Sequence, residues 1–257
     1  MPSLWFVFMN GTSHASYSFL IFSAVSFFLL GTVPGGGASV LAILAGMLPD
    51  IDGLFWKLSH LGKKSGMEFQ HHLMYPTHWP VFYLPLVAIS IIAWLAGFYP
   101  MHFLAITLGV YSHLVFDSIS CGDGMNWGAP WGRRFINLFS SKTDGYHGLY
   151  WAARFRTTIF FKIQMVAAAI AAGLLAWFAS MYISDVFLYV AGIAVLVVVA
   201  IMDLLPVPKE FKQEPPEGRY YDYRLKPGYY ERLSPAMRER VKSWRESHGH
   251  AMPGPQT

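Results

Sequence analysis

Charged residues are scarce in this sequence. Only 13% of its 257 residues are charged, whereas 54% are hydrophobic and 17% are aromatic. This balance excludes an ordinary soluble domain and is typical of an integral membrane protein. The net charge of +4 comes without a basic patch interleaved with aromatic residues, so nucleic acid is not predicted as a partner.

Cysteine and several catalytic motifs are also rare or missing. The single cysteine, Cys121, excludes an internal disulfide bond and does not identify the cellular compartment. No Gly-x-Ser-x-Gly motif is present, which disfavours serine hydrolase chemistry, and the run "PGGG" lacks the Lys-Ser/Thr pair of a nucleotide-binding loop. No Lys or Arg precedes the first apolar segment, so a cleaved signal peptide is not expected.

Long apolar runs are abundant instead. A membrane-spanning helix needs about 20 predominantly apolar residues, and the candidates are residues 17–33, 38–48, 79–99, 103–119, 157–182 and 186–207. We therefore predict an all-α fold, a polytopic bundle of about six transmembrane helices in a domain of residues 1–207. The second candidate is short because Pro49 ends it, so Asp50 and Asp52 are expected below headgroup level unless neighbouring helices shield them.

The Lys and Arg residues lie on one side of this predicted topology. They occur between the second and third candidates, between the fourth and fifth, and after the sixth, whereas the turns "GTVPGGGAS" and "AGFYPM" contain none. Short basic loops stay on the cytoplasmic side of the membrane. We therefore expect a multi-pass inner-membrane protein with both termini in the cytoplasm and the lipid bilayer as its surroundings.

Residues 208–257 differ in composition, being rich in Pro, Glu, Arg and Tyr, which predicts a cytoplasmic tail. A short amphipathic helix is expected within it, because Ser234 is a suitable N-cap and Met237, Val241 and Trp244 recur at helical spacing. The basic residues between them favour a helix that lies on anionic lipid. A marginal helix on a solvated tail is the alternative.

Ionisable residues lie at the predicted cytoplasmic ends of the first four helices. Because odd-numbered spans begin and even-numbered spans end at that face, we expect these residues to converge at one end of the bundle. His113 and Asp117 are four residues apart, so they share one side of a helix and can reach a single metal ion. The candidate metal ligands are His14, Asp50, Asp52, His71, His72, His78, His113 and Asp117.

A metal site explains why carboxylates occur in this set. Each would cost about 2.5–3.5 kcal/mol at membrane depth, and neighbouring carboxylates would repel one another. Two divalent cations would neutralise them, and ligands without thiolates favour zinc, manganese or iron. Taken singly, each residue also has a simpler interpretation as a packing histidine or a capping aspartate, which is retained for His60, His102 and His147.

Four sequence elements together resemble a known family. They are His14, the "LPDID" element with Asp50 and Asp52, the run "HHLMYPTH" that ends at His78, and "GVYSHLVFDSIS" with its Ser-His-x-x-x-Asp spacing. In this order they are similar to the membrane-bound metal-dependent hydrolases typified by the LexA-regulated inner-membrane YdjM proteins, over residues 10–135. The resemblance implies a hydrolase but not its substrate.

One element departs from the family pattern. The family usually reads His-Arg-Gly-x-x-His-Ser, whereas no Arg or Gly follows the His pair here and Trp79 replaces Ser. Either His71 or His72 is therefore the ligand, and the sequence leaves the choice open.

The expected reaction is the hydrolysis of an ester or phosphoester by a metal-activated water. A site that faces the headgroups favours a lipid or another membrane-associated substrate. Arg133 and Arg134 are candidates for pairing with a phosphate, with ordinary loop charges as the alternative. Asp52 or Asp117 is the candidate catalytic base. The alternative function is a non-catalytic membrane protein with a structural metal site, or a metal-ion carrier, although carrier sites usually lie near the midplane.

Overall fold

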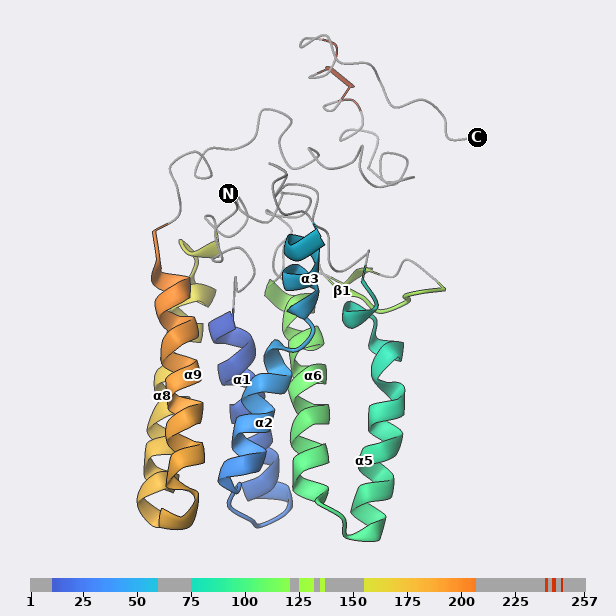
Figure 1. Ribbon diagram of the computed structural model, residues 1–257. Helices are drawn as coiled ribbons and strands as arrows, with labels where there is room; N and C mark the ends of the chain where they lie inside the picture. Colours follow the sequence, from blue (N-terminus) through green and yellow to red (C-terminus); the bar gives the residue numbers. More distant parts are fainter. Residues whose placement is uncertain are drawn as a thin grey trace.

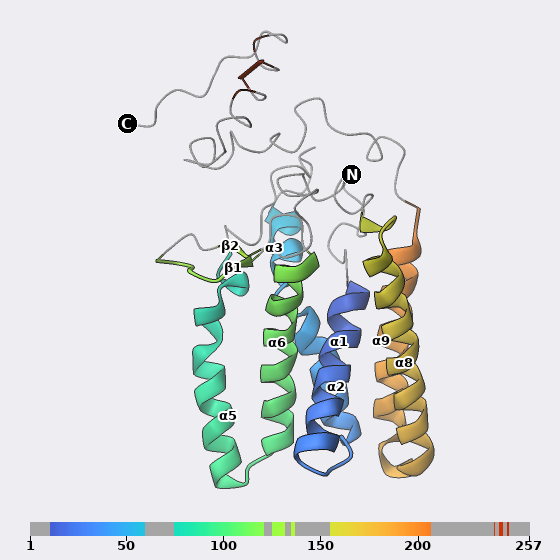
Figure 2. The ribbon, with the colours of Figure 1, turned by 180° about the vertical axis from the view of Figure 1, so that it is seen from behind.

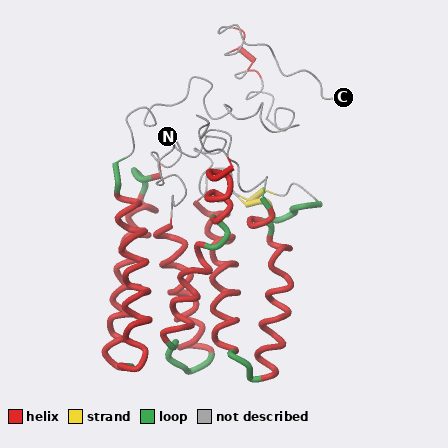
Figure 3. The backbone as a smooth tube through the Cα atoms, viewed as in Figure 1, coloured by secondary structure: helices red, strands yellow, loops and turns green. Residues whose placement is uncertain are grey.

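A computed structural model of the chain describes residues 11–59, 75–120, 125–131, 135–136 and 155–206, with four further positions at 239, 242, 243 and 246. The described part is mostly helical (Figure 3). Its longer helices run side by side along one axis (Figure 1), and they are α1 (Gly11–Ala24), α2 (Gly36–Met47), α5 (Leu84–Ala96), α6 (Pro100–Ser120), α8 (Ile159–Met181) and α9 (Val186–Leu204).

Within the described residues, four helical stretches are long and apolar enough to cross a membrane. They are Gly11–Leu29, which adds the π-helical turn η2 (Val25–Leu29) to α1, then Pro100–Ile119, Ile159–Met181, and Ile183–Leu204, which adds the 3-10 turn η5 (Ile183–Asp185) to α9. Two shorter apolar helices are Gly36–Met47 and Pro80–Ala96, the latter made of η4 (Pro80–Tyr83) and α5. All six predicted apolar segments are thus helical, and four of them have the length of a span.

The first helix begins earlier than the apolar pattern predicts. It starts at Gly11 rather than near residue 17, so His14 lies inside α1 instead of before it. The early turns are rich in small polar residues that are buried against other helices, and the Ser16 hydroxyl donates to the carbonyl oxygen of Thr12 at 2.6 Å. Because protein rather than lipid surrounds these turns, their low hydropathy does not end the helix.

One short helix and one pair of strands were not predicted. The expected break at Pro49 is confirmed, since α2 ends at Met47, but a new helix, α3 (Ile51–Ser59), follows it directly. Strands β1 (Met125–Asn126) and β2 (Phe135–Ile136) form an antiparallel pair, so the described fold is not purely α-helical. Met125 is fully buried and packs near the end of α6, which holds this pair against the bundle.

The helices that carry the candidate ligands form the centre of the bundle. α1, α2 and α6 pack against one another, the α8–α9 hairpin packs on α1 and α2, and α5 packs on α6, as the view from behind also indicates (Figure 2). The largest buried cluster joins α1 and α2 to the hairpin, and it contains Phe19, Ile43, Leu175, Phe178 and Leu196. The hairpin therefore serves as an apolar backing for the central helices.

Two glycines allow the central helices to approach closely. A Cβ at Gly46 would overlap the hydroxyl of Ser18 and the carbonyl oxygen of His14 on α1. A Cβ at Gly109 on α6 would lie 2.7 Å from the Ala45 Cβ and 2.8 Å from a backbone oxygen of α2. Small residues at helix crossings are the usual means of close packing in membranes, and here they bring α1 and α6 within reach of the same end of α2.

Two aspartates of the α8–α9 hairpin cap the central helices. Asp185 accepts a hydrogen bond from the Gly36 backbone N–H at 2.8 Å, at the start of α2. Asp203, near the other end of α9, accepts one from the Thr12 backbone N–H at 3.1 Å, at the start of α1. Carboxylates at helix N-termini satisfy otherwise unpaired amides and interact favourably with the helix dipole. α1 and α2 are antiparallel, so the two caps lie at opposite ends of the bundle.

The predicted tail helix falls mostly outside the described residues. The four described positions there, Glu239, Lys242, Ser243 and Glu246, are helical and exposed.

Candidate metal centre

The ligand candidates meet at the end of the bundle where α1 begins and α6 ends. The local folds follow from the sequence, because Pro49 ends α2 just before the two aspartates and Pro76 starts the 3-10 turn η3 (Pro76–His78). The Tyr83 hydroxyl holds that turn by donating to the carbonyl oxygen of Thr77 at 2.8 Å. The residues brought together are His14 in α1, Asp50 before α3, His78 at the end of η3, and His113 and Asp117 in α6.

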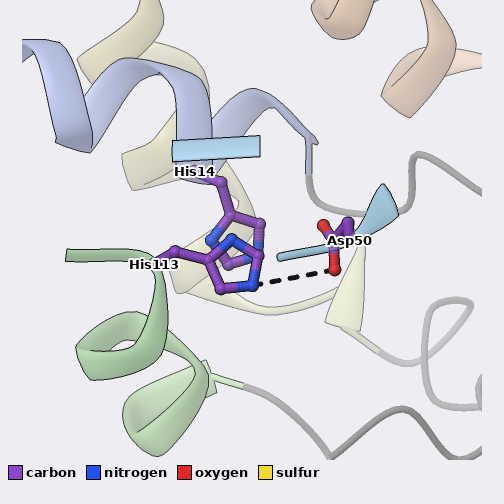
Figure 4. Close-up of side chains that lie close together, drawn as sticks. All are labelled: His14, Asp50 and His113. Carbon is purple, nitrogen blue, oxygen red and sulfur yellow. Dashed lines mark ion pairs between the residues drawn. The ribbon is translucent and has the colours of Figure 1, made fainter. Parts of the chain in front are cut away.

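The donor atoms of these residues lie close together in two overlapping groups that share His113. His113 Nε2 lies 3.0 Å from Asp117 Oδ2 and 3.3 Å from His78 Nε2. Asp117 Oδ1 lies 3.5 Å from His14 Nε2. Asp50 Oδ1 lies 3.5 Å from His78 Nε2 and 3.7 Å from His113 Nε2, the second of these pairs being marked in Figure 4. The rings of His14 and His113 stack with their centroids 3.7 Å apart.

These separations fit a transition-metal ion. Imidazole nitrogens and carboxylate oxygens bind zinc at about 2.0–2.2 Å, so two donors on a tetrahedral ion lie about 3.3 Å apart. The measured separations of 3.0–3.7 Å bracket this value. The donor set of imidazoles and carboxylates, with no thiolate, suits zinc, manganese or iron.

Hydrogen bonds on the outer side fix two of the imidazoles. The Nδ1–H of His113 donates to the Gly46 carbonyl oxygen at 2.6 Å. Because a carbonyl oxygen only accepts, this contact assigns the hydrogen to Nδ1 and leaves the Nε2 lone pair facing the centre. His78 is held in the same way by Asp52 Oδ2, 2.9 Å from its Nδ1, and the Thr77 hydroxyl donates to that oxygen at 2.9 Å. A carboxylate behind a metal-binding histidine is a common outer-shell partner.

The charges of the centre are compatible with a bound cation. His78 and His113 are fully buried, His14 and Asp117 nearly so, and the Asp50 side chain is the most open of the five with 12% of its surface exposed. Burial opposes protonation of His78, but hydrogen bonds with Asp50 and Asp52 raise its pKa to about 10 in the metal-free protein. A divalent ion at Nε2 would replace that proton and balance the buried carboxylates.

Burial and the nearby Asp52 carboxylate together raise the pKa of the Tyr75 hydroxyl beside the centre, which keeps that hydroxyl neutral.

The described ligand candidates are linked through one shared residue. They fall into two overlapping groups, His14–Asp50–His113 and His78–His113–Asp117, which share His113. Since Nδ1 of His113 already donates to Gly46, only its Nε2 is available, and that nitrogen serves a single ion. The expected number of two ions stays a prediction, and two further candidate ligands, His71 and His72, lie outside the described residues.

Asp52 has a different place from the one that the sequence suggested. It was expected as a metal ligand or as the catalytic base, but its Oδ2 faces Nδ1 of His78 and the Thr77 hydroxyl. It therefore lies behind an imidazole and orients it. Arg133 and Arg134, proposed as phosphate ligands, lie outside the described residues, as do His60 and His147. His102 lies in the first turn of α6, away from the centre, with its ring 5.3 Å from that of Tyr99.

Sequence reasoning missed Gly46 and Thr77. Each had a faint signal, since Gly46 stands in the small-residue run just before "LPD" and Thr77 directly precedes a ligand histidine. Neither residue type suggests metal chemistry alone, because one acts through its backbone carbonyl and the other through a carboxylate.

Comparison with known proteins adds one match. A family model described as "YdjM inner membrane protein" matches residues 9–202, which include all of these ligands. No curated protein and no solved structure matches the chain.

Proposed function

The chain belongs to the YdjM inner membrane protein family, and from this premise we propose that it is a metal-dependent hydrolase acting on an ester or phosphoester in the membrane. The observation that carries the proposal is the clustering of three imidazoles and two carboxylates in two groups that share His113, with the outward nitrogens of His78 and His113 already hydrogen-bonded. Such a centre fits a bound ion better than it fits a purely structural polar network.

The five ligand candidates have unequal surroundings, which suggests separate roles. His14, His78 and His113 offer imidazole nitrogens, and Asp117 lies near all three, so these four residues would hold the ion. Asp50 is the most exposed member, so it lies on the side from which water and substrate approach. We assign Asp50 the role of general base, which accepts a proton from the attacking water.

A bound divalent ion supplies Lewis acidity, which lowers the pKa of water and polarises the ester oxygen. The residues of the protein orient the ligands and shape the surroundings of the ion. Asp52 and the Gly46 carbonyl hold two imidazoles in one orientation, and the other candidate ligands are more deeply buried than Asp50.

The substrate class follows from the position of the centre at one end of an apolar bundle. Trp79, next to His78, is partly buried, and Trp131, just after β1, is 83% exposed. Tryptophan is enriched where membranes meet water, so these side chains support a centre near one interface. The ester bonds of phospholipids and other lipids lie in this region, and we propose them as substrates.

We further propose that this end of the bundle faces the cytoplasm. The basic connections predicted for that side support this, and α1 begins at the end where α9 finishes, as the Thr12–Asp203 contact requires. A fluorescent protein fused after Thr257 should therefore fluoresce, whereas alkaline phosphatase at the same point should be inactive. An active phosphatase fusion would reverse the orientation.

A structural metal site is the second candidate, and the burial of four of the five ligands favours it. In that case the ion would only tie the helices together. The two accounts differ in whether turnover depends on Asp50.

The deciding experiment uses purified protein in lipid nanodiscs, stripped with a chelator and reloaded with Zn²⁺, Mn²⁺ or Fe²⁺. We expect ion-dependent release of product from a panel of fluorogenic lipid esters and phosphoesters. Asp50→Asn should keep the ion but lose about 100-fold or more in turnover, in line with the usual contribution of a general base. His147→Gln is the control and should behave as the wild type. Full ion content with no turnover on any substrate would favour the structural site.

A further inference from the structure

Among the described residues, the α8–α9 hairpin contributes no ligand candidate to the metal centre, yet it carries a buried carboxylate that contacts the start of the helix that holds His14. Asp203, near the end of α9, is only 3% exposed. Burying a carboxylate in a membrane protein is costly, so its position calls for an explanation beyond apolar backing.

The contacts of Asp203 lead to the first turn of α1. Its Oδ2 accepts the backbone N–H of Thr12 at 3.1 Å, and the side-chain amide of Gln164 on α8 approaches the same oxygen at 3.5 Å. Thr12 and Gln164 are both buried. The Thr12 amide is one of those at the helix start that have no partner within the helix. Asp203 therefore ties the beginning of α1 to a point 191 residues along the chain.

A basic side chain supports this tie. The Arg156 guanidinium, just before α8, donates a hydrogen bond to the carbonyl oxygen of Leu205 at the end of α9, and Asp203 attracts it electrostatically. Arg156 and Thr12 thus both contact the end of α9, and these contacts fix the position of the Asp203 carboxylate along α1.

His14 is the ligand that depends most on such a tie. The imidazoles of His78 and His113 are each oriented by a hydrogen bond at Nδ1. His14 Nδ1 is buried and has no hydrogen-bond partner among the described residues. Its ring rests on the face of His113 and its Nε2 faces Asp117, but no hydrogen bond on the outer side orients the ring, so its position depends strongly on its own backbone. That backbone lies two residues beyond Thr12, in the turn that Asp203 holds.

We propose that Asp203, backed by Gln164, is a positioning residue for the metal centre and fixes His14 through the start of α1. Asp52 orients His78 by contacting its imidazole ring, whereas Asp203 positions His14 by contacting the main chain of α1. The inference rests on the proposed metal centre and is independent of the proposed hydrolysis.

The hairpin offers a matched control for this role. Asp185 makes the same kind of contact, from a carboxylate to the first amide of a central helix, but it does so at the opposite end of the bundle. Loss of either cap removes one buried hydrogen bond and should reduce thermal stability similarly. Only the loss of Asp203 should disturb the metal centre.

The test compares Asp203→Leu, Asp203→Asn and Asp185→Leu with the wild type in nanodiscs. The measurements are the Zn²⁺ dissociation constant, the visible spectrum of the Co²⁺-loaded protein, and the melting temperature. We expect Asp203→Leu to weaken Zn²⁺ binding by about 10- to 100-fold, the usual effect of losing an outer partner of a metal ligand, and to alter the Co²⁺ spectrum. Asp203→Asn keeps an acceptor oxygen for Thr12 and should recover much of the affinity.

Asp185→Leu should lower the melting temperature without changing the Zn²⁺ affinity or the Co²⁺ spectrum. Equal weakening of Zn²⁺ binding in Asp203→Leu and Asp185→Leu would overturn the proposal, as would wild-type affinity and spectrum in Asp203→Leu. If Asp203→Leu does not fold, Asp203→Asn and Gln164→Leu replace it in the test. Weaker Zn²⁺ binding in Gln164→Leu, together with wild-type Zn²⁺ affinity and Co²⁺ spectrum in Asp203→Asn, would support the proposal. Wild-type Zn²⁺ affinity and Co²⁺ spectrum in both variants would refute it. A wild-type protein that binds neither ion would instead refute the metal centre itself.

Discussion

Replacing His113 by alanine, or Asp117 by asparagine, is expected to abolish metal binding and with it all turnover. His113 lies within 3.0–3.7 Å of three other candidate ligands, and Asp117 is the carboxylate nearest to it. Asp117→Asn keeps the size of the side chain but removes the charge that an ion requires. Both proteins should still insert into the membrane, because the apolar faces of α6 are unchanged. Metal analysis of the purified variants measures the effect.

Two further variants are expected to have a smaller effect on metal binding or none. Asp52→Asn removes a carboxylate that orients His78 without facing the centre, so metal affinity should fall by about 10- to 100-fold rather than disappear. His102→Gln changes a histidine at the other end of α6 and should leave metal content unchanged. If His113 and Asp117 merely hydrogen-bond to each other, their variants will lose melting temperature and keep their metal, which would contradict the proposed centre.

Replacing Gly46 by leucine is expected to separate α1 from α2 and to cost about 3 kcal/mol or more of stability, at or beyond the upper end for overpacked cores. A side chain at this position meets the Ser18 hydroxyl and, more seriously, the His14 backbone, which cannot rotate away. Gly46 also supplies the carbonyl that orients His113. The same substitution should therefore also abolish metal binding, because it displaces the carbonyl that orients His113.

Gly173 on α8 provides the control for this substitution. A Cβ there meets nothing within 4 Å, so Gly173→Leu should change neither melting temperature nor metal content. Melting curves and metal analysis of both leucine variants, together with the milder Gly46→Ala, test the prediction. A Gly46→Leu protein that melts like the Gly173→Leu protein would show that α1 and α2 are free to move apart.

The sequence predicted the helices better than it predicted their ends. Apolar runs identify segments that face lipid, because hydropathy is high where lipid is the surrounding. The first described turns of α1 are surrounded by protein instead, so their Ser, Thr and His residues hid the helical residues from Gly11 onwards. Helix α3 was missed for a related reason, since it begins only two residues after a proline that ends the previous helix.

The candidate site was predictable in membership but not in arrangement. Successive helices run in opposite directions, so the sequence places five candidate ligands at the same end of the bundle. The structure brings these residues together, namely His14, Asp50, His78, His113 and Asp117. The place of Asp52 could not be foreseen, because it depends on the angle at which η3 meets α3. The role proposed for Asp203 could not be predicted from the sequence, since an aspartate at the end of an apolar helix resembles an ordinary interfacial charge.

The short length of α2 has a consequence for the depth of the metal centre. Its 12 residues rise about 18 Å, whereas the hydrocarbon core of a bilayer is about 30 Å thick. The start of α2 lies level with the α8–α9 turn, as the Gly36–Asp185 contact requires, so Asp50 at its other end stops well short of the far interface. Such a hydrophobic mismatch is met either by local thinning of the bilayer or by a recess that water must fill. Thinning would bring the headgroups down to the centre, whereas a recess would leave the centre below them; for the proposed hydrolysis, the second case favours an acyl ester of a lipid, which already lies below the headgroups, over a soluble molecule.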